Sequence, residues 1–191
     1  MFLSILAQRP FKKKIGAHIS KCYNGKKSEV TAMELVEVKN EKDLAVLMPL
    51  LKEIWSEVFT PIIGADQVAY MLANYQSQAN IEDEMKKGAH YLLLVYDSKP
   101  VGYTAYEENE EEVYLSKLYL HANTRGKGFS SQVFDWYERL AKGKRLYLNV
   151  NQGNTLAISV YEHRGFTRAG ERYVDIGQGF IMNDYIYEKL C

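Results

Sequence analysis

Two groups of residues in the second half of the chain have types and spacings suited to binding phosphate and donating a proton. The first is the run Arg-Gly-Lys-Gly-Phe-Ser at residues 125–130, which opens a segment with apolar residues at helical spacing. Glycine allows a close backbone approach to a ligand, and a first helical turn offers unpaired N–H groups to an anion. Arg125 and Lys127 add positive charge. The run predicts a phosphate-binding loop, although an ordinary helix start would use the same glycines.

The second group consists of Asn154, Ala157, Tyr161 and Arg164, whose spacing places them on one face of a helix. The alanine leaves room for a ligand against that face, and the tyrosine presents a hydroxyl beside it. A phenol has a reference pKa of about 10, so at neutral pH it is protonated and can supply a proton to a leaving group. We therefore favour Tyr161 as a general acid over a residue that only packs.

A repeated strand–loop–helix pattern must position these two groups. Residues 113–120 and 145–150 are apolar and β-prone, and each stretch is followed by a polar connector. Helices are expected over residues 129–140 and 155–164, with Gly165 just past the end of the second. Each group therefore lies in the loop and helix that follow a strand.

The remaining segments complete an α/β pattern. Asn40 can cap a first helix, in which Pro49 is expected to cause a kink or a fresh start. A break at residues 60–64 precedes a second helical region, from Asp66 to about Lys86. Further strands are predicted at residues 34–38, 90–96, 101–107, 167–176 and 181–190. The order β-α-α-β-β-β-α-β-α-β-β predicts a single α/β domain, with a mixed central sheet of about seven strands and helices on both faces.

Charge divides the chain into two parts. Residues 1–32 carry a balance of +6 and residues 33–191 a balance of −6, which cancel over the 191 residues. We interpret residues 1–32 as a basic N-terminal extension, either a solvated arm or sequence upstream of a natural start at Met33. We favour either of these interpretations over a segment that binds nucleic acid or a membrane. Residues 33–191 are the predicted domain.

The cysteine and hydropathy patterns favour a cytoplasmic protein. Cys22 and Cys191 lack metal-ligand spacing and make a poor disulfide framework. No apolar run approaches a membrane span, and Phe2–Ala7 is too short for a secretory core. We therefore predict no metal site and neither a nucleic-acid nor a membrane partner, and a homodimer through the closing strands is left open.

The two groups together resemble the signatures of the GNAT superfamily of N-acetyltransferases, over about residues 34–190. That family's cofactor loop is Gln or Arg, two residues, Gly, one residue, then Gly or Ala. Arg125, Gly128 and Ser130 hold these places, and Ser130, the departure, is small and still offers a backbone N–H. The later signature, Asn-x-x-Ala-x-x-x-Tyr-Glu followed by Gly-Phe, is matched by Asn154, Ala157, Tyr161, Glu162, Gly165 and Phe166.

The resemblance implies an acetyl-CoA-dependent N-acetyltransferase that passes the acetyl group directly to a primary amine of a small molecule, a polyamine or a protein. It implies no protein nucleophile, Tyr161 as the acid for the departing thiolate, and a backbone N–H that polarises the thioester carbonyl. The pantetheine arm would lie along the backbone of Leu118 and Leu120, against Asn149 and Val150. The implied cofactor-binding residues are Leu118, Tyr119, Leu120, Arg125, Gly126, Lys127, Gly128, Phe129, Ser130, Asn149, Asn154, Ala157, Tyr161 and Arg164.

The acceptor and the base that deprotonates it stay open. The resembled family lines its acceptor pocket with the two early helices, although aromatic residues at helical spacing more often belong to the core. The aromatic candidates there are Trp55, Phe59, Tyr70 and Tyr75. Glu107, Glu112 and Tyr119 lie in the region expected for a base. The acidic run 107–112 could attract a polycationic acceptor, but we favour a solvated hairpin end.

Two other functions use the same residues. A non-catalytic or weakly catalytic acyl-CoA-binding sensor would keep the cofactor site without turnover, because fold does not fix function. A dinucleotide-dependent oxidoreductase fits poorly, because no acidic residue ends a following strand about 20 residues after the glycine loop.

Overall fold

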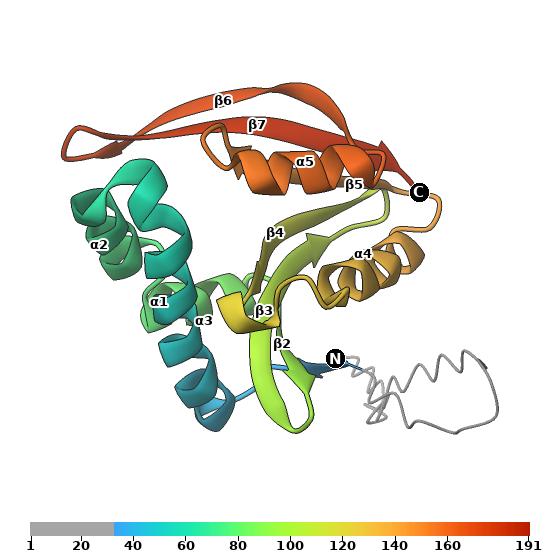
Figure 1. The fold of residues 1–191 in the computed structure, drawn as a ribbon, viewed down its shortest axis with the longest axis horizontal. Coiled ribbons are helices and arrows are strands. Elements are labelled where there is room, and N and C mark those ends of the chain that lie inside the picture. The colour runs from blue at the N-terminus through green and yellow to red at the C-terminus, as the bar shows by residue number, and fades with distance from the viewer. Residues whose placement is uncertain (1–32) are drawn as a thin grey trace, which may run out of the picture.

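The protein is described by a computed structural model of residues 33–191, which form one α/β domain (Figure 1). The interpretation of residues 1–32 as a basic extension lies outside the described residues. The elements in chain order are β1 (Glu34–Glu37), α1 (Glu41–Ile63), α2 (Ala65–Asn74), α3 (Gln78–Lys86), β2 (His90–Tyr96), β3 (Lys99–Glu108), β4 (Glu112–Leu120), α4 (Phe129–Leu140), β5 (Arg145–Asn151), α5 (Thr155–His163), β6 (Thr167–Gly177) and β7 (Phe180–Leu190).

The seven strands form one mixed sheet in the order β1-β2-β3-β4-β5-β7-β6. Helices α1, α2 and α3 lie on one side of it and α4 and α5 on the other, which confirms the predicted architecture (Figure 1). All neighbouring strands are antiparallel except β4 and β5. That parallel pair is joined only between residues 112–114 and 145–147, so the two strands separate beyond Tyr114 and Tyr147.

Two hydrophobic cores fill the space on either side of the sheet. On the α4 and α5 side, alternate residues of β4 and β5, such as Val113, Leu146 and Leu148, pack against Phe134 and other apolar residues. On the other side, the apolar stripe of α1 packs against β2 and β3. Helices therefore cover both faces of the sheet, while β4 and β5 separate near its centre.

Helix α1 makes no fresh start at Pro49, and it runs through Pro61 to Ile63, so the break expected over residues 60–64 is confined to its cap, Gly64. A proline removes one backbone hydrogen bond and crowds the preceding turn. Burial of the stripe Leu44, Leu47, Leu51, Ile54, Trp55 and Phe59 offsets that cost. Asn40 caps the helix as predicted, accepting hydrogen bonds from the N–H groups of Lys42 and Asp43 at 2.9 and 3.3 Å.

The single helical region predicted from Asp66 to about Lys86 is wrong in one respect, because it consists of two helices, α2 and α3. The chain turns between them at Tyr75–Ser77, and the Ser77 hydroxyl caps α3 by accepting from the Asn80 N–H at 3.3 Å. The domain therefore has one helix more than the predicted element order.

A β-bulge in β4 decides which side chains face which side of the sheet. Ala105 pairs with Lys117 and Tyr106 with Leu115, so Ser116 is an extra residue in the strand. Leu115 packs in the core beneath α4 and α5. After the bulge, Tyr119 packs on the opposite side, among the residues of α1 and β3.

Candidate active site

A cleft of about 540 Å³ lies where β4 and β5 separate. Its walls are the second half of β4, the loop before α4, the end of β5 and one face of α5. Of the predicted cofactor-binding residues, it is lined by Leu118, Tyr119, Leu120, Arg125, Gly126, Phe129, Ser130, Asn149, Asn154, Ala157 and Tyr161. The structure thus brings most of that predicted set into one continuous opening.

The loop before α4 has the features of an anion site. Gly126 and Gly128 have φ angles of 75° and 77°, a left-handed conformation that suits glycine, and a Cβ on either would meet nothing within 4 Å. Within residues 33–191, the N–H groups from Gly126 to Ser130 donate to no backbone carbonyl outside the helix, and no side chain caps α4. These free donors, with Lys127 between them, fit a diphosphate group.

The edge of β4 offers further backbone groups to the cleft. The His121 N–H donates to the Val101 carbonyl at 2.8 Å, which marks the residues that bond to β3. Because bonding alternates along an antiparallel pair, the N–H and C=O groups of Leu118 and Leu120 point the other way, toward the separated β5. A pantetheine arm carries amides that could bond to such an edge.

Tyr161 lines the same cleft from α5. Its ring packs edge-on against Phe134 and Phe166, each at 5.9 Å between ring centroids. Its hydroxyl has no hydrogen-bond partner within residues 33–191, and burial raises its pKa to about 12. The phenol is therefore protonated, held in place by its ring and free to donate into the cleft.

Two arginines of the predicted set have other partners. Arg164 is held by Asp135 and Glu138 of α4, at 2.5 and 3.1 Å, and like Lys127 and Gly128 it is not among the residues that line the cleft, so its part in cofactor binding stays a prediction. The Arg125 side chain pairs with Glu57 at 2.8 Å and donates to the Leu120 carbonyl at 3.2 Å. Among the described residues, the positive charge without an ion-pair partner at the loop is therefore that of Lys127.

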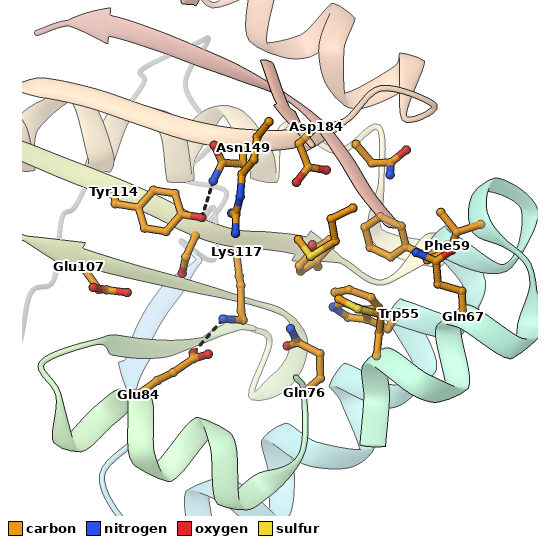
Figure 2. Close-up of a pocket in the computed structure, with 17 residues that line it drawn as sticks. Trp55, Phe59, Gln67, Gln76, Glu84, Glu107, Tyr114, Lys117, Asn149 and Asp184 are labelled. Carbon is orange, nitrogen blue, oxygen red and sulfur yellow. Dashed lines mark hydrogen bonds and ion pairs between the residues drawn. The ribbon is translucent and has the colours of Figure 1, made fainter. Parts of the chain in front are cut away.

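A second cavity, of about 260 Å³, opens on the α1–α3 side of the sheet (Figure 2). Trp55 and Phe59, both buried in the core on this side of the sheet, also form an apolar wall of the cavity, while polar and charged side chains come from α2, α3 and the strands β3 to β7. Gln76 Oε1 is buried here without a hydrogen-bond partner among the described residues, and Trp55 Nε1 lies near the Tyr103 hydroxyl without a well-formed hydrogen bond to it. A ligand with both donor and acceptor groups would satisfy them.

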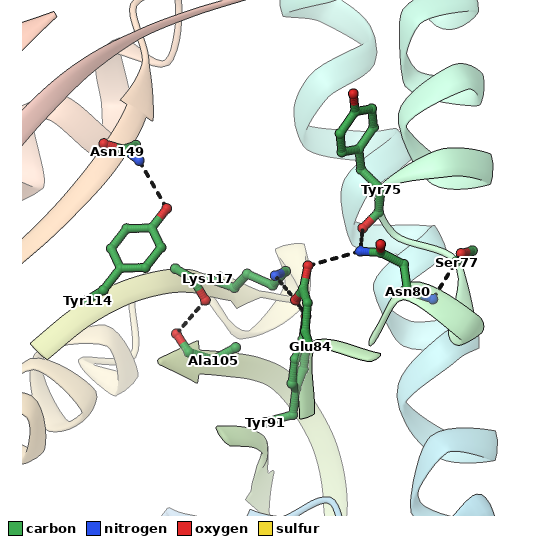
Figure 3. Close-up of polar contacts among 10 residues, drawn as sticks. Tyr75, Ser77, Asn80, Glu84, Tyr91, Ala105, Tyr114, Lys117 and Asn149 are labelled. Atoms are coloured by element: carbon green, nitrogen blue, oxygen red, sulfur yellow. Dashed lines mark hydrogen bonds and ion pairs between the residues drawn. The ribbon is translucent and has the colours of Figure 1, made fainter. Parts of the chain in front are cut away.

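Glu84 anchors the floor of this cavity (Figure 3). Its carboxylate accepts hydrogen bonds from the Tyr91 hydroxyl and from Asn80 Nδ2 at 2.9 Å, and it pairs with Lys117 Nζ at 3.0 Å. Only 9% of the Lys117 side chain is exposed, and its ammonium lies over the Tyr91 ring. The pair is therefore a satisfied unit, with Lys117 buried and Glu84 partly buried, and not a free acid or base.

The two openings meet where the strands separate. Phe59, Ser116, Lys117, Tyr119, Asn149 and Asn151 line both of them. Asn149 Nδ2 donates to the Tyr114 hydroxyl at 3.0 Å, which fixes the wall between β4 and β5 (Figure 2). Groups held in the two cavities can therefore touch at this junction.

The three candidate bases occupy different places. Glu107 lines the second cavity and Tyr119 lines both, but burial raises the pKa of Tyr119 well above its ordinary value. Glu112 pairs with Arg145 at 3.0 Å at the start of β4 and lines neither opening. Asp184, which the sequence reasoning missed, lines the second cavity from β7. The sequence contained a signal for this residue, since Met182, Asp184 and Ile186 share one face of the strand and Asp184 is the charged residue between two apolar ones.

The long β6–β7 hairpin forms one wall of the second cavity. Ile176 is an extra residue in β6, and its carbonyl accepts hydrogen bonds from the hydroxyls of Tyr70 and Tyr75. Gln67 Nε2 donates to the Ile181 carbonyl at 2.8 Å. Tyr70 and Tyr75 thus hold the hairpin against α2 and do not line the cavity, unlike Trp55 and Phe59.

Some other kinds of site are absent from the described part of the chain. Residues 33–191 contain no group of three His, Cys, Asp or Glu side chains that could hold a metal ion. None of their helices combines the length and the apolar character needed to cross a membrane.

Solved structures share this architecture. The PaiA N-acetyltransferase of Thermoplasma acidophilum, in complex with coenzyme A, has a TM-score of 0.66 at 19% identity, covering 84% of this chain and 99% of its own. A GCN5-related N-acetyltransferase of Rhodopseudomonas palustris has a TM-score of 0.67 at 16% identity, covering 84% and 96%. An acetyltransferase of Thermus thermophilus has a TM-score of 0.59 at 23% identity, covering 85% and 99%. At these identities the likeness shows the fold.

The family is shown by the sequence itself. No curated protein matches the chain. The profile of the acetyltransferase (GNAT) family matches residues 48–166, which is more than half of the chain and includes both the glycine loop and the Asn154–Tyr161 signature. The chain therefore belongs to the acetyltransferase (GNAT) family.

Proposed function

We propose that the protein is an acetyl-CoA-dependent N-acetyltransferase that acts on the primary amine of a small molecule. The observation that carries the proposal is the junction of the two cavities. One opening has free N–H groups for a diphosphate, the other has polar groups for an acceptor, and Tyr119 and Asn149 line both. Acetyl-CoA, when bound, would supply an activated acetyl group at that junction.

The cleft suits the shape and charge of acetyl-CoA. The free N–H groups from Gly126 to Ser130, with Lys127, match its diphosphate, and the β4 edge at Leu118 and Leu120 matches its amide-bearing arm. The solved structure from Thermoplasma acidophilum contains coenzyme A, and one from Elizabethkingia anophelis, with a TM-score of 0.51, contains acetyl-CoA. These likenesses support the cofactor assignment.

The chain's own residues would do two things in the reaction. Tyr161 donates its phenolic proton to the sulfur as the thiol leaves, because its hydroxyl is protonated and has no other partner within residues 33–191. The apolar wall of Trp55 and Phe59 keeps water from the reacting carbon. Neither role needs a protein nucleophile, and the amine attacks the acetyl group directly.

The contacts of the β6–β7 hairpin favour a small acceptor over a protein tail. The hairpin is joined to α2 through the carbonyls of Ile176 and Ile181, and its residues Arg172, Met182 and Asp184 form a fixed wall of the cavity. A cavity of about 260 Å³ accommodates a small amine, whereas an extended peptide needs an open groove.

The first test is thermal denaturation with acetyl-CoA, with NADH and ATP as controls. Binding to the folded state raises its stability by about 2.7 kcal/mol at a hundredfold excess over the dissociation constant. We expect stabilisation by acetyl-CoA alone. Stabilisation by NADH instead, or no response at millimolar acetyl-CoA, would contradict the proposal.

The second test separates an enzyme from an acyl-CoA sensor. Release of free thiol is measured with a panel of small monoamines, diamines and a lysine-containing peptide. We expect turnover with small amines and little with the peptide. Binding of acetyl-CoA without turnover of any amine would support the sensor, and turnover of the peptide alone would contradict a small acceptor.

A further inference from the structure

Asp184 is a buried carboxylate that faces the second cavity. It is 5% exposed, and within residues 33–191 its carboxylate has no hydrogen bond and no ion pair within 4.0 Å. Figure 2 shows it pointing from β7 into the cavity, across from Lys117 and Gln76. A buried carboxylate is costly unless something pairs with it, so its position needs an explanation.

The other carboxylates around the cavity do not share this condition. Glu84 is saturated by Tyr91, Asn80 and Lys117. Glu107 is exposed to solvent at the end of β3. Asp184 alone of the three is both buried and, within the described residues, without a hydrogen bond or a close ion pair. Arg172 lies directly opposite it on β6 and lines the same cavity, but no ion pair within 4.0 Å joins them, so the carboxylate oxygens of Asp184 are left for a cationic ligand.

Sheet register places Asp184 beside the junction of the two cavities. It lies directly opposite Asn151 of β5, and both side chains are on the same face of the sheet. Asn151 and Asn149 line the cleft as well as the cavity. A group that binds Asp184 is therefore one strand away from the site where the acetyl group would lie.

We infer that Asp184 binds the ammonium group of the acceptor and takes a proton from it before the acetyl transfer. This inference rests on the proposed function. The ammonium nitrogen gives one proton to the carboxylate and becomes a neutral amine. Its lone pair forms the C–N bond, the C–S bond breaks, and the sulfur takes a proton from Tyr161. The second proton lost by the nitrogen restores the Tyr161 hydroxyl through water, and Asp184 returns its proton to solvent.

The environment of Asp184 supports proton acceptance. Burial raises its pKa above the ordinary value, which makes the carboxylate a better base, and Arg172 on β6 lowers it to a smaller extent. The other titratable groups around the cavity are Glu84 on α3, Glu107 on β3, and Tyr114, Lys117 and Tyr119 on β4. Burial raises the pKa of both Tyr114 and Tyr119, so neither tyrosine accepts a proton near neutral pH.

The test compares Asp184→Asn with the wild type and with Asp97→Asn as a matched control. Asp97 lies in the exposed β2–β3 turn at a φ of 51°, a conformation that asparagine tolerates, and its change removes the same charge. The kcat/KM for a small amine is measured across pH. Thermal stabilisation by acetyl-CoA confirms that each variant is folded with its cofactor site intact.

We expect Asp184→Asn to lower kcat/KM for the amine by about 100-fold or more at neutral pH, with the KM for acetyl-CoA unchanged. In the wild type, activity should rise through the ionisation of a carboxylate. In the variant, kcat/KM should rise only near the higher pKa of the amine itself, because without the carboxylate only an amine that is already neutral can react. Asp97→Asn should match the wild type in both.

An unchanged pH profile in a folded Asp184→Asn variant would overturn the inference while leaving the proposed function intact. A higher KM for the amine with an unchanged profile would also overturn it, since binding without proton transfer would explain that result. If the variant does not fold, the wild-type profile decides, because an activity that follows only the pKa of the amine excludes a carboxylate base. If the wild type acetylates no amine, the proposed function and this inference both fail.

Discussion

Replacement of Tyr161 by phenylalanine is the sharpest test of the acid catalyst. The change removes only a hydroxyl that has no hydrogen-bond partner among the described residues, and it keeps the ring packed between Phe134 and Phe166. Loss of an unpaired hydroxyl should change the free energy of unfolding by less than about 0.5 kcal/mol, the range of changes that break no specific interaction. Any large loss of turnover therefore comes from the missing proton donor and not from unfolding.

General acid catalysis contributes about 10²–10⁴-fold, so we expect Tyr161→Phe to lower kcat by one to three orders of magnitude, with water supplying part of the proton donation. The KM for acetyl-CoA should change little. Because burial raises the pKa of Tyr161 to about 12, the wild type should show no loss of activity from ionisation of this group below about pH 11.

The assay is release of free thiol with saturating acetyl-CoA and a small amine. The matched control is Tyr187→Phe, whose hydroxyl donates to Glu162 Oε1 at 2.7 Å and lies outside both cavities. That variant should lose about 0.5–1.5 kcal/mol of stability and keep its turnover. Wild-type turnover in Tyr161→Phe, or equal losses in both variants, would refute the assignment.

Three further predictions follow from geometry. Gly128→Ala should destabilise the fold by about 1–2 kcal/mol, as should Gly143→Ala, because both glycines have left-handed φ angles and open space around them, but only the first should weaken acetyl-CoA binding in a thermal titration. Asp184→Asn should raise the melting temperature at neutral pH. Burial raises the pKa of Asp184, so the folded wild type is stabilised when this carboxyl is protonated and loses that stability as pH rises through the raised pKa. The difference in melting temperature between the variant and the wild type should therefore vanish in acid. Tyr70→Phe removes the hydrogen bond from the Tyr70 hydroxyl to the Ile176 carbonyl, which holds the hairpin wall of the second cavity. It should therefore raise the KM for the amine but not for acetyl-CoA, whereas Tyr173→Phe, on the exposed side of the same hairpin, should change neither KM.

Sequence patterns predicted the strands well because each of them has a simple local cause. Alternating or continuous apolar residues of β character mark all seven strands within a few residues of their observed bounds. Asn40 was recognisable as a cap, since capping depends on residues nearby in the chain. The fresh start allowed at Pro49 and the break expected at Pro61 did not occur, because the cost of a proline is local while the burial that offsets it comes from β2 and β3.

Sequence analysis found the candidate site residues whose place depends on local backbone conformation. It missed those whose place depends on contacts with distant parts of the chain. The glycine loop and the face of Asn154, Ala157 and Tyr161 follow from spacing alone, and the structure brings them into one cleft. Arg164 shares that spacing but pairs with α4, which no local pattern reveals. Asp184 meets the cavity only because β7 lies beside β5, and that pairing joins segments far apart in the sequence.

The bulge at Ser116 lets one alternating series of residues serve both faces of the sheet. Val113 and Leu115 pack beneath α4 and α5, whereas Tyr119, which continues the same alternation, packs on the α1 side. Without an extra residue, strict alternation would place all of them on one face. Deletion of Ser116 would leave these faces unchanged, because Leu115 and Lys117 would then follow each other and keep their partners Tyr106 and Ala105 on β3. What the deletion would remove is the local bend and twist that a bulge gives to its strand.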